Sequence, residues 1–230
     1  MALEAVLFDK DGTLVDFHLT WDVAVGNALR HAAQDTVALS GAADAVHYDL
    51  VQNTVLSSSP FIAESNETVL ALLAPFVDIK AYVEVLGPAA VSHAAAAPGV
   101  DGFLAQLGHA GIKLAVVTND DVAPAEQQLA ALGWTDRFAA VIGADSVTRA
   151  KPDPEMVFAA LNQLGGIDTA SAVMIGDSSH DLVAANAAGV TSVLVTNGSV
   201  ADAAMAVLAD LVVASVAELD HALASIGLPL

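Results

Sequence analysis

The stretch EAVLFDKDGTL, residues 4–14, decides the fold class of this chain. Its apolar run, residues 5–8, ends in Asp9 and is broken at Gly12, which predicts a buried strand followed by a turn. The same pattern recurs further along the chain, as KLAVVTN (113–119), AAVIG (139–143), AVMIGD (172–177), TSVLVT (191–196) and DLVV (210–213). The recurrence predicts a sheet of several buried strands.

Segments with helical spacing of apolar residues separate the later strands. They cover residues 100–110, 124–132, 154–164 and 180–188. Strands that alternate with helices indicate a parallel α/β sheet with right-handed crossovers. Gly189 suits a helix C-terminal stop, and Pro124 and Pro154 suit first-turn positions. The predicted fold class is therefore α/β, a Rossmann-like parallel sheet.

One long region lacks this alternation and is rich in Ala, Leu and Val at helical spacing. We expect helices within it at residues 19–33, 42–56, 62–73 and 79–96, and Pro98-Gly99 marks the return to the sheet. The predicted domains are a core of residues 1–16 and 98–230, and an inserted all-helical domain of residues 17–97.

The charge balance excludes some classes of partner. The chain has 27 acidic and 7 basic residues and a formal net charge of −20, so its mean field repels nucleic acid and anionic membranes. It has no cysteine, no basic leader ahead of an apolar run, and no uncharged apolar stretch of about 18 residues that could span a bilayer. We expect a cytoplasmic protein, monomeric or homodimeric, without nucleic-acid or membrane partners.

Polar side chains suited to phosphate chemistry follow the predicted strands or precede the helices. They are Asp9, Asp11, Thr118, Asn119, Lys151, Asp177 and Asp181. Because the carboxyl ends of parallel strands meet in one crevice, these groups are expected to share a pocket. Clustered carboxylates repel one another unless a hard cation lies among them, and Mg²⁺ prefers oxygen ligands of this kind together with a substrate phosphate.

The chemistry of phosphoryl transfer assigns roles to these residues. Asp9, fixed at a strand end, is placed to attack phosphorus as the nucleophile. Asp11 can protonate the leaving group and later deprotonate the attacking water. Thr118 and Asn119 can donate hydrogen bonds to the phosphate, and Lys151 can offset the charge of the transition state.

Four segments in order resemble the four motifs of the haloacid dehalogenase superfamily. They are DKDGTL (9–14), VTN (117–119), KPDP (151–154) and GDSSHD (176–181). The helical insert resembles the C1 cap of the phosphoglycolate-phosphatase-like branch. The resemblance implies the roles given above, with magnesium held by Asp9, the carbonyl of Asp11 and Asp177, and with Asp181 in support. The alternative for Asp181 is a structural role alone, in which its charge stabilises the first turn of its helix through the helix dipole.

Three further residues bear on this resemblance. Lys10 differs from the apolar residue common at its position in that branch, and its side chain is expected to face away from the crevice. His18 and Trp21 directly follow the catalytic loop and are the preferred candidates for substrate contact from the insert. The alternative for Trp21 is a place in the hydrophobic core.

The sequence predicts a magnesium-dependent phosphatase acting on a small phosphorylated metabolite, with phosphoglycolate as the first substrate to try. Within enzymes, the alternative is a sugar phosphomutase of the β-phosphoglucomutase type, which the catalytic motifs do not separate from a phosphatase. A non-catalytic phosphate-binding module on the same type of sheet is the alternative outside enzymes. Asp11 disfavours a dehalogenase, because dehalogenation does not use an acid/base at that position.

Overall fold

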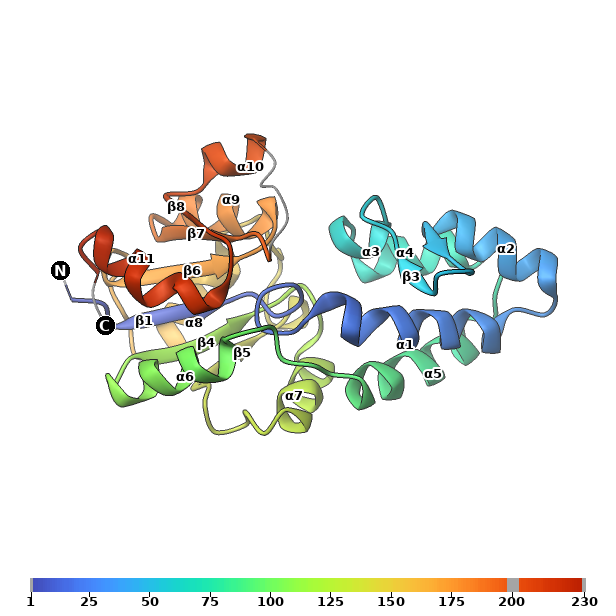
Figure 1. The fold of residues 1–230 in the computed structure, drawn as a ribbon, viewed down its shortest axis with the longest axis horizontal. Coiled ribbons are helices and arrows are strands. Elements are labelled where there is room, and N and C mark those ends of the chain that lie inside the picture. The colour runs from blue at the N-terminus through green and yellow to red at the C-terminus, as the bar shows by residue number, and fades with distance from the viewer. Residues whose placement is uncertain (1, 198–202, 229–230) are drawn as a thin grey trace. The chain divides into compact units, whose positions relative to one another are not determined.

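The structure, a computed structural model, describes residues 2–197 and 203–228 and divides into two compact units (Figure 1). One, the sheet unit, comprises Met1–Asp16 and Ala96–Leu230. The other, the helical unit, comprises Phe17–Ala95. Each is described by itself.

The sheet unit contains a six-stranded sheet in the order β5-β4-β1-β6-β7-β8. The strands are β1 (Ala5–Phe8), β4 (Lys113–Val117), β5 (Ala140–Ile142), β6 (Ala172–Gly176), β7 (Thr191–Val195) and β8 (Leu211–Val213). Every neighbouring pair is parallel, with Leu7 of β1 opposite Ala115 of β4 and Met174 of β6. The predicted α/β parallel sheet is confirmed.

Helices lie between these strands and after the last of them. They are α6 (Val100–His109), α7 (Val122–Ala131), α8 (Glu155–Gln163), α9 (Ser179–Ala188), α10 (Ala203–Leu208) and α11 (Leu219–Ser225), with 3₁₀ turns at Ala144–Ser146, Thr169–Ser171 and Val216–Glu218. Gly189 ends α9 at φ 75°, in the left-handed conformation that glycine adopts without steric cost.

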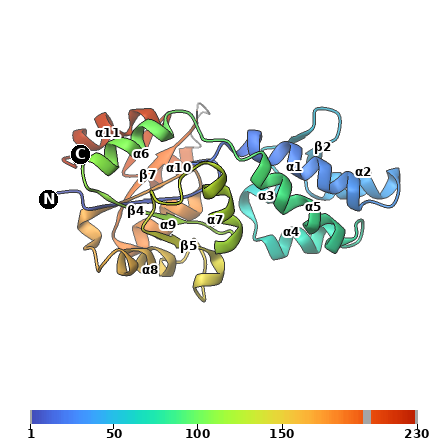
Figure 2. The same cartoon turned by 90° about the horizontal axis from the view of Figure 1, so that it is seen from below.

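The two faces of the sheet bury different side chains of the same strand. In β1, Val6 and Phe8 belong to one hydrophobic cluster and Ala5 and Leu7 to the other. Figure 2 shows α6 and α11 over the first face and α8 over the second. All four β1 residues are fully buried, and each large apolar side chain so buried contributes about 1.5–3 kcal/mol. β1 is therefore firmly fixed at the centre of the sheet.

The helical unit consists of helices and one short hairpin. Its elements are α1 (Phe17–Ala32), α2 (Thr36–Ala45), β2 (Tyr48–Asp49), β3 (Thr54–Val55), α3 (Pro60–Ala63), α4 (Asn66–Leu73) and α5 (Ile79–Ser92). α1 packs along α5. Leu29, Leu73 and Tyr82 are buried in a hydrophobic cluster that belongs to the helical unit alone. Asp35 and Asp78 begin α2 and α5 by accepting hydrogen bonds from backbone N–H groups of the first turn.

The expected helix at residues 42–56 is wrong for most of its length. α2 ends at Ala45, and the antiparallel pair β2–β3 follows. Asp49 accepts hydrogen bonds from the N–H groups of Val51 and Gln52, and Asn53 adopts a positive φ of 54°. Asp and Asn at these places form a turn, so the chain reverses where a helix was expected.

The expected helix at residues 62–73 is divided in two. Glu64 is extended after α3, and the Ser65 side chain accepts the N–H of Thr68 to begin α4. Serine competes for backbone hydrogen bonds in this way and favours caps over helix interiors. Helix α5 also ends earlier than expected, at Ser92.

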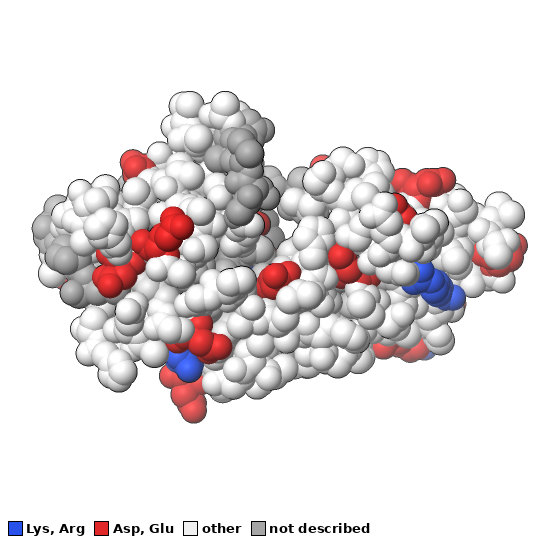
Figure 3. All heavy atoms as spheres, in the orientation of Figure 1, with Lys and Arg blue, Asp and Glu red and all other residues white. Residues whose placement is uncertain are grey.

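Charge and hydropathy of the described residues fit the sequence analysis. None of their helices combines the length and the apolar character that crossing a membrane requires. On the face drawn in Figure 3, Asp and Glu side chains are spread over the surface and Lys and Arg are few. A bound anion must therefore be compensated by groups at its own site.

Candidate active site

Three neighbouring strands bring the central candidate residues to one edge of the sheet. β1 lies between β4 and β6, and all three run parallel. Asp9 follows β1, Thr118 follows β4 and Asp177 follows β6. Their side chains therefore begin from adjacent strand ends, as the sequence predicted for a parallel sheet.

A tight turn carries the chain away from Asp9. The carbonyl of Lys10 accepts hydrogen bonds from the N–H groups of Leu14 and Val15, both at 2.9 Å. Gly12 has a φ of +83°, and a Cβ at this position would overlap the Asp177 carboxylate. Only glycine both adopts this positive φ without steric cost and leaves room for the Asp177 carboxylate beside its Cα.

Lys151 lies at the centre of the site. Its ammonium donates to Asp9 Oδ1 at 2.6 Å, to Asp181 Oδ1 at 2.6 Å and to the carbonyl of Val117 at 2.7 Å. The lysine is 5% exposed, and a lysine ammonium has three protons to donate. One buried cation therefore joins the ends of β1 and β4 to helix α9.

Asp181 is fully buried, and both of its oxygens are engaged. Oδ1 accepts from Lys151, while Oδ2 accepts from the Ser178 N–H at 3.1 Å and from the Ser178 hydroxyl at 2.6 Å. The Ser178 contacts close a capping box at the start of α9. These contacts hold Lys151 in place, so Asp181 is suited to support the site.

The carboxylates of Asp9, Asp177 and Asp181 form a cluster that suits a metal ion. One oxygen of each lies within 4.8 Å of the others. Burial raises the pKa of Asp9 to about 7; Lys151 opposes this shift, and the charges of Asp181 and Asp11 reinforce it. Burial and the charges of Asp9 and Asp181 also raise the pKa of Asp177 well above its usual range. The surplus negative charge and the all-oxygen donors fit a hard divalent cation such as Mg²⁺.

Thr118 and Asn119 lie beside this cluster. Thr118 is buried, and its hydroxyl accepts the N–H of Asp120 at 3.2 Å; a hydroxyl that accepts one bond can still donate its own proton. The Asn119 amide donates to the Lys151 carbonyl and accepts the Lys151 N–H, both at 3.1 Å. Asn119 thus fixes the Lys151 backbone, while its predicted contact with phosphate stays a prediction.

Lys10 makes contacts that the sequence analysis did not predict. Its fully buried ammonium contacts the carboxylate of Asp11, that of Asp120 at 3.0 Å and the side-chain carbonyl of Gln128. The charges of both carboxylates raise its pKa against the opposing effect of burial. The ammonium thus binds the carboxylate of the predicted acid/base from its buried side, and the expectation that the side chain faces away from the crevice stays a prediction.

Sequence reasoning missed three residues around the site. Asp120 and Gln128 bind Lys10, and the Asn197 amide donates to the carbonyl of Gly12. Asp120 directly follows Asn119 in the second motif, a signal that could have drawn attention to it. Gln128 and Asn197 carry no such signal, because they meet the first motif only in three dimensions.

His18 and Trp21 both lie on α1 of the helical unit. His18 is exposed, and its Nδ1 lies 3.2 Å from the Asp22 carboxylate. Trp21 is partly buried against the hydrophobic cluster of this unit. Their predicted contact with substrate stays a prediction.

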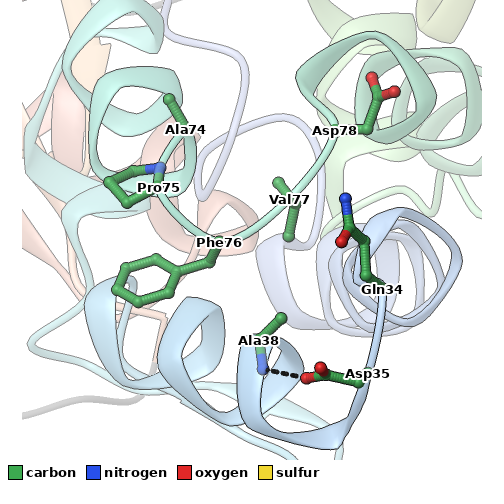
Figure 4. A pocket seen from close by; sticks show the side chains of 8 residues that line it. All are labelled: Gln34, Asp35, Ala38, Ala74, Pro75, Phe76, Val77 and Asp78. Carbon is green, nitrogen blue, oxygen red and sulfur yellow. Dashed lines mark hydrogen bonds between the residues drawn. The ribbon is translucent and has the colours of Figure 1, made fainter.

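The helical unit also has a hollow of about 350 Å³. Figure 4 shows its lining residues, Gln34, Asp35, Ala38, Ala74, Pro75, Phe76, Val77 and Asp78. Asp35 and Asp78 are occupied as helix caps here, and none of the lining residues belongs to the four motifs. This hollow is not a candidate for the phosphate chemistry.

Comparison with known proteins supports the interpretation of the motifs. A phosphoglycolate phosphatase of Colwellia psychrerythraea is 31% identical over 201 residues, covering 85% of each protein. One from Neisseria meningitidis is 45% identical over 101 residues, 44% of this chain and 43% of that protein. For the first five curated relatives the match spans 42–57% of their length, about half.

A solved structure extends the likeness to the whole chain. The crystal structure of a haloacid dehalogenase family hydrolase from Deinococcus radiodurans, described with bound phosphate and sodium, is 30% identical. It superposes with a TM-score of 0.70 over 99% of both chains. The family model of the haloacid dehalogenase-like hydrolases matches residues 3–189. This chain therefore belongs to the haloacid dehalogenase-like hydrolase family.

Proposed function

We propose that the protein is a magnesium-dependent phosphatase that hydrolyses a small phosphomonoester through an aspartyl phosphate on Asp9. The proposal rests on one contact. The Lys151 ammonium donates a hydrogen bond to Asp9 Oδ1 at 2.6 Å, beside the Asp177 carboxylate. A carboxylate held by a buried cation at a strand end has a fixed line of attack, which an in-line displacement requires.

The first half-reaction forms the intermediate. An Asp9 oxygen attacks phosphorus, the bond from phosphorus to the ester oxygen breaks, and Asp11 gives its proton to the departing alkoxide. Lys151 and the Thr118 hydroxyl are the groups proposed to offset charge on the equatorial phosphoryl oxygens. Lys151 is suited to this because it is buried, where charge is little screened.

The second half-reaction returns the enzyme to its starting state. Water attacks phosphorus of the aspartyl phosphate, Asp11 takes a proton from that water, and the bond between Asp9 and phosphorus breaks. Inorganic phosphate leaves, and Asp9 is again a carboxylate. Asp11 therefore alternates between acid and base, as the return of each proton demands.

Asp9 and Asp177 are the residues that would hold Mg²⁺ directly, with Asp181 in support and the Asp11 carbonyl as the further ligand that the family resemblance implies. A bound Mg²⁺ would neutralise carboxylate and phosphate charge and orient the phosphate. Both oxygens of Asp181 already accept hydrogen bonds from Lys151 and Ser178, which favours its supporting role.

The proposed substrate class follows from the relatives. Proteins named phosphoglycolate phosphatase match this chain, and the related Deinococcus structure is described with bound phosphate. Phosphoglycolate is therefore the first ester to test. We further expect a monomer or homodimer in the cytoplasm, with the helical unit acting as the cap and with His18 and Trp21 among its substrate contacts.

The deciding experiment measures magnesium-dependent release of phosphate from p-nitrophenyl phosphate and 2-phosphoglycolate. Asp9→Asn should abolish turnover, and Asp11→Asn should lower kcat by about 10²–10⁴. Asp136→Asn, which changes an exposed aspartate of the same unit, serves as the control and should keep wild-type rates. Full activity of Asp9→Asn would remove the mechanism.

The same assay separates the alternatives. A phosphomutase would convert a sugar phosphate to its isomer without net release of inorganic phosphate. A binding module would retain phosphate in equilibrium dialysis yet turn over no ester in a broad panel.

A further inference from the structure

We propose that Lys10 is a positioning residue for Asp11: its ammonium fixes the acid/base carboxylate between the ends of β1 and β4. This inference rests on the proposed phosphatase function and deepens it. Lys10 is a fully buried charged side chain that the phosphoryl-transfer scheme above leaves without a role.

Three side-chain acceptors surround the Lys10 ammonium. They are the Asp11 carboxylate, the Asp120 carboxylate at 3.0 Å and the Gln128 side-chain carbonyl. The lysine ammonium has three protons in a tetrahedral arrangement, so three acceptors define its position. The ammonium is therefore held as a fixed point.

These acceptors come from different parts of the sheet unit. Asp11 lies in the turn after β1, Asp120 in the segment after β4, and Gln128 on α7, which follows that segment. The backbone carbonyl of Lys10 also accepts the N–H groups of Leu14 and Val15. The backbone of Lys10 thus closes its own turn, and its side chain joins that turn to the segment after β4 and to α7.

Burial of the Lys10 charge costs free energy, and so does the loss of any of its partners. An ammonium removed from water is stable only when its charge is paired and its protons are donated. Gln128 is 1% exposed, and its side-chain oxygen accepts a hydrogen bond from the Lys10 ammonium. The side chains of Asp11 and Asp120 are each 20% exposed to solvent. The site of Asp11 is consequently anchored from its buried side and accessible from the other.

Positioning Asp11 matters because proton transfer depends on the place of the carboxylate. A general acid must reach the leaving oxygen within hydrogen-bond distance, and a displacement of about 1 Å can lower the rate about 100-fold. An apolar side chain at position 10 would leave the carboxylate without this ionic contact. Lys10 should therefore influence catalysis through Asp11 and not through direct contact with substrate.

The test compares two esters in Lys10→Met, which keeps most of the side-chain length and removes the charge. The kcat/KM for 2-phosphoglycolate should fall about 10- to 100-fold. The fall for p-nitrophenyl phosphate should be smaller, because p-nitrophenolate leaves with little help from an acid. Lys10→Arg retains a positive charge and should restore part of the loss.

A matched control is Lys113→Met. Lys113 lies in the same unit at the first residue of β4 and donates to the carbonyl of Leu164 at 2.6 Å. Its replacement removes a lysine charge from the same unit and should change neither kcat/KM nor the ratio between the esters.

A double-mutant cycle distinguishes positioning from general destabilisation. In an Asp11→Asn background, Lys10→Met should change kcat by less than about twofold, since coupled residues are not additive. If the two losses multiply instead, Lys10 does not act through Asp11 and the inference is overturned. If Lys10→Met does not fold, Asp120→Asn, which loosens the ammonium from the β4 side, should change the ester ratio in the same direction.

The outcomes also separate this inference from the function on which it rests. A wild type that hydrolyses neither ester overturns both. The role of Lys10 alone is overturned by a different set of results. The wild type is then active and Asp9→Asn abolishes turnover, but Lys10→Met and Asp120→Asn keep the wild-type ratio of kcat/KM between the two esters.

Discussion

At the scale of single residues, two lysines organise the carboxylates of the site. Lys151 binds Asp9 and Asp181, and Lys10 binds Asp11 and Asp120. Each lysine is almost or fully buried, so each carries charge that solvent does not screen. One ammonium group thus binds the proposed nucleophile, Asp9, and the other binds the proposed acid/base, Asp11.

The Lys151 contacts predict a large loss of stability when the lysine is replaced. Lys151→Met leaves Asp181 buried beside Asp9 without a cation, and breaking such a buried pair costs about 3–5 kcal/mol. The free energy of unfolding from urea titration at pH 8 without metal should fall by that amount. Lys113→Met is the control, and a Lys151→Met protein as stable as this control would contradict the prediction.

At the scale of elements, Asp22 holds the β2–β3 hairpin on α1. Its carboxylate accepts the Val55 N–H and the Thr54 hydroxyl, both at 2.8 Å, and its backbone carbonyl accepts the Tyr48 hydroxyl at 2.9 Å. Strands of two residues have little stability of their own, so they depend on such contacts.

Asp22→Ala should therefore loosen the hairpin while leaving α1 and α5 folded. Loss of the carboxylate leaves the Val55 N–H unpaired, which costs about 1–3 kcal/mol. Hydrogen exchange should show faster exchange of the Val55 amide and unchanged amides in α5. Asp44→Ala, at an exposed position of α2, is the control. Unchanged protection of Val55 would show that Asp22 does not hold the hairpin.

At the scale of the whole molecule, the carboxylate cluster links stability to pH and to metal. Asp9 has a pKa raised to about 7, and that of Asp177 is also raised, so the folded state keeps protons that the unfolded state has lost. The contribution of Asp9 to stability is thus greatest in acid and falls as the pH rises from about 4 through its folded pKa of about 7, and the contribution of Asp177 falls in the same direction. Once these carboxylates are ionised, they repel one another unless a cation offsets their charge.

If the cluster binds Mg²⁺ as proposed, magnesium should raise the Tm more at pH 8 than at pH 5, because the ion would bind the ionised carboxylates of the folded state. Asp177→Asn should raise the Tm of the metal-free protein at pH 8 and remove most of the shift caused by Mg²⁺. Thermal unfolding with and without Mg²⁺ or EDTA measures both effects. Asp136→Asn should respond to Mg²⁺ as the wild type does, and an equal magnesium shift at both pH values would contradict the linkage.

The family, the parallel sheet and the residues at its strand ends could all be predicted from the amino-acid sequence. Runs such as residues 5–8 and 172–176 predict buried strands, and a parallel sheet places the carboxyl ends of its strands at one edge. For this reason Asp9, Asp177, Asp181 and Lys151 could be expected in one place. The hairpin at residues 48–55 escaped notice because two-residue strands show no alternation.

The pairing of the charges, in contrast, could be seen only in the three-dimensional structure. Lys151 meets Asp9 across 142 positions of the chain, and Lys10 meets Gln128 across 118. No local pattern encodes such contacts, since they depend on strand order and on how α7 packs against the sheet. Sequence periodicity specifies which face a residue occupies, whereas the partner it finds there depends on the packing of distant elements.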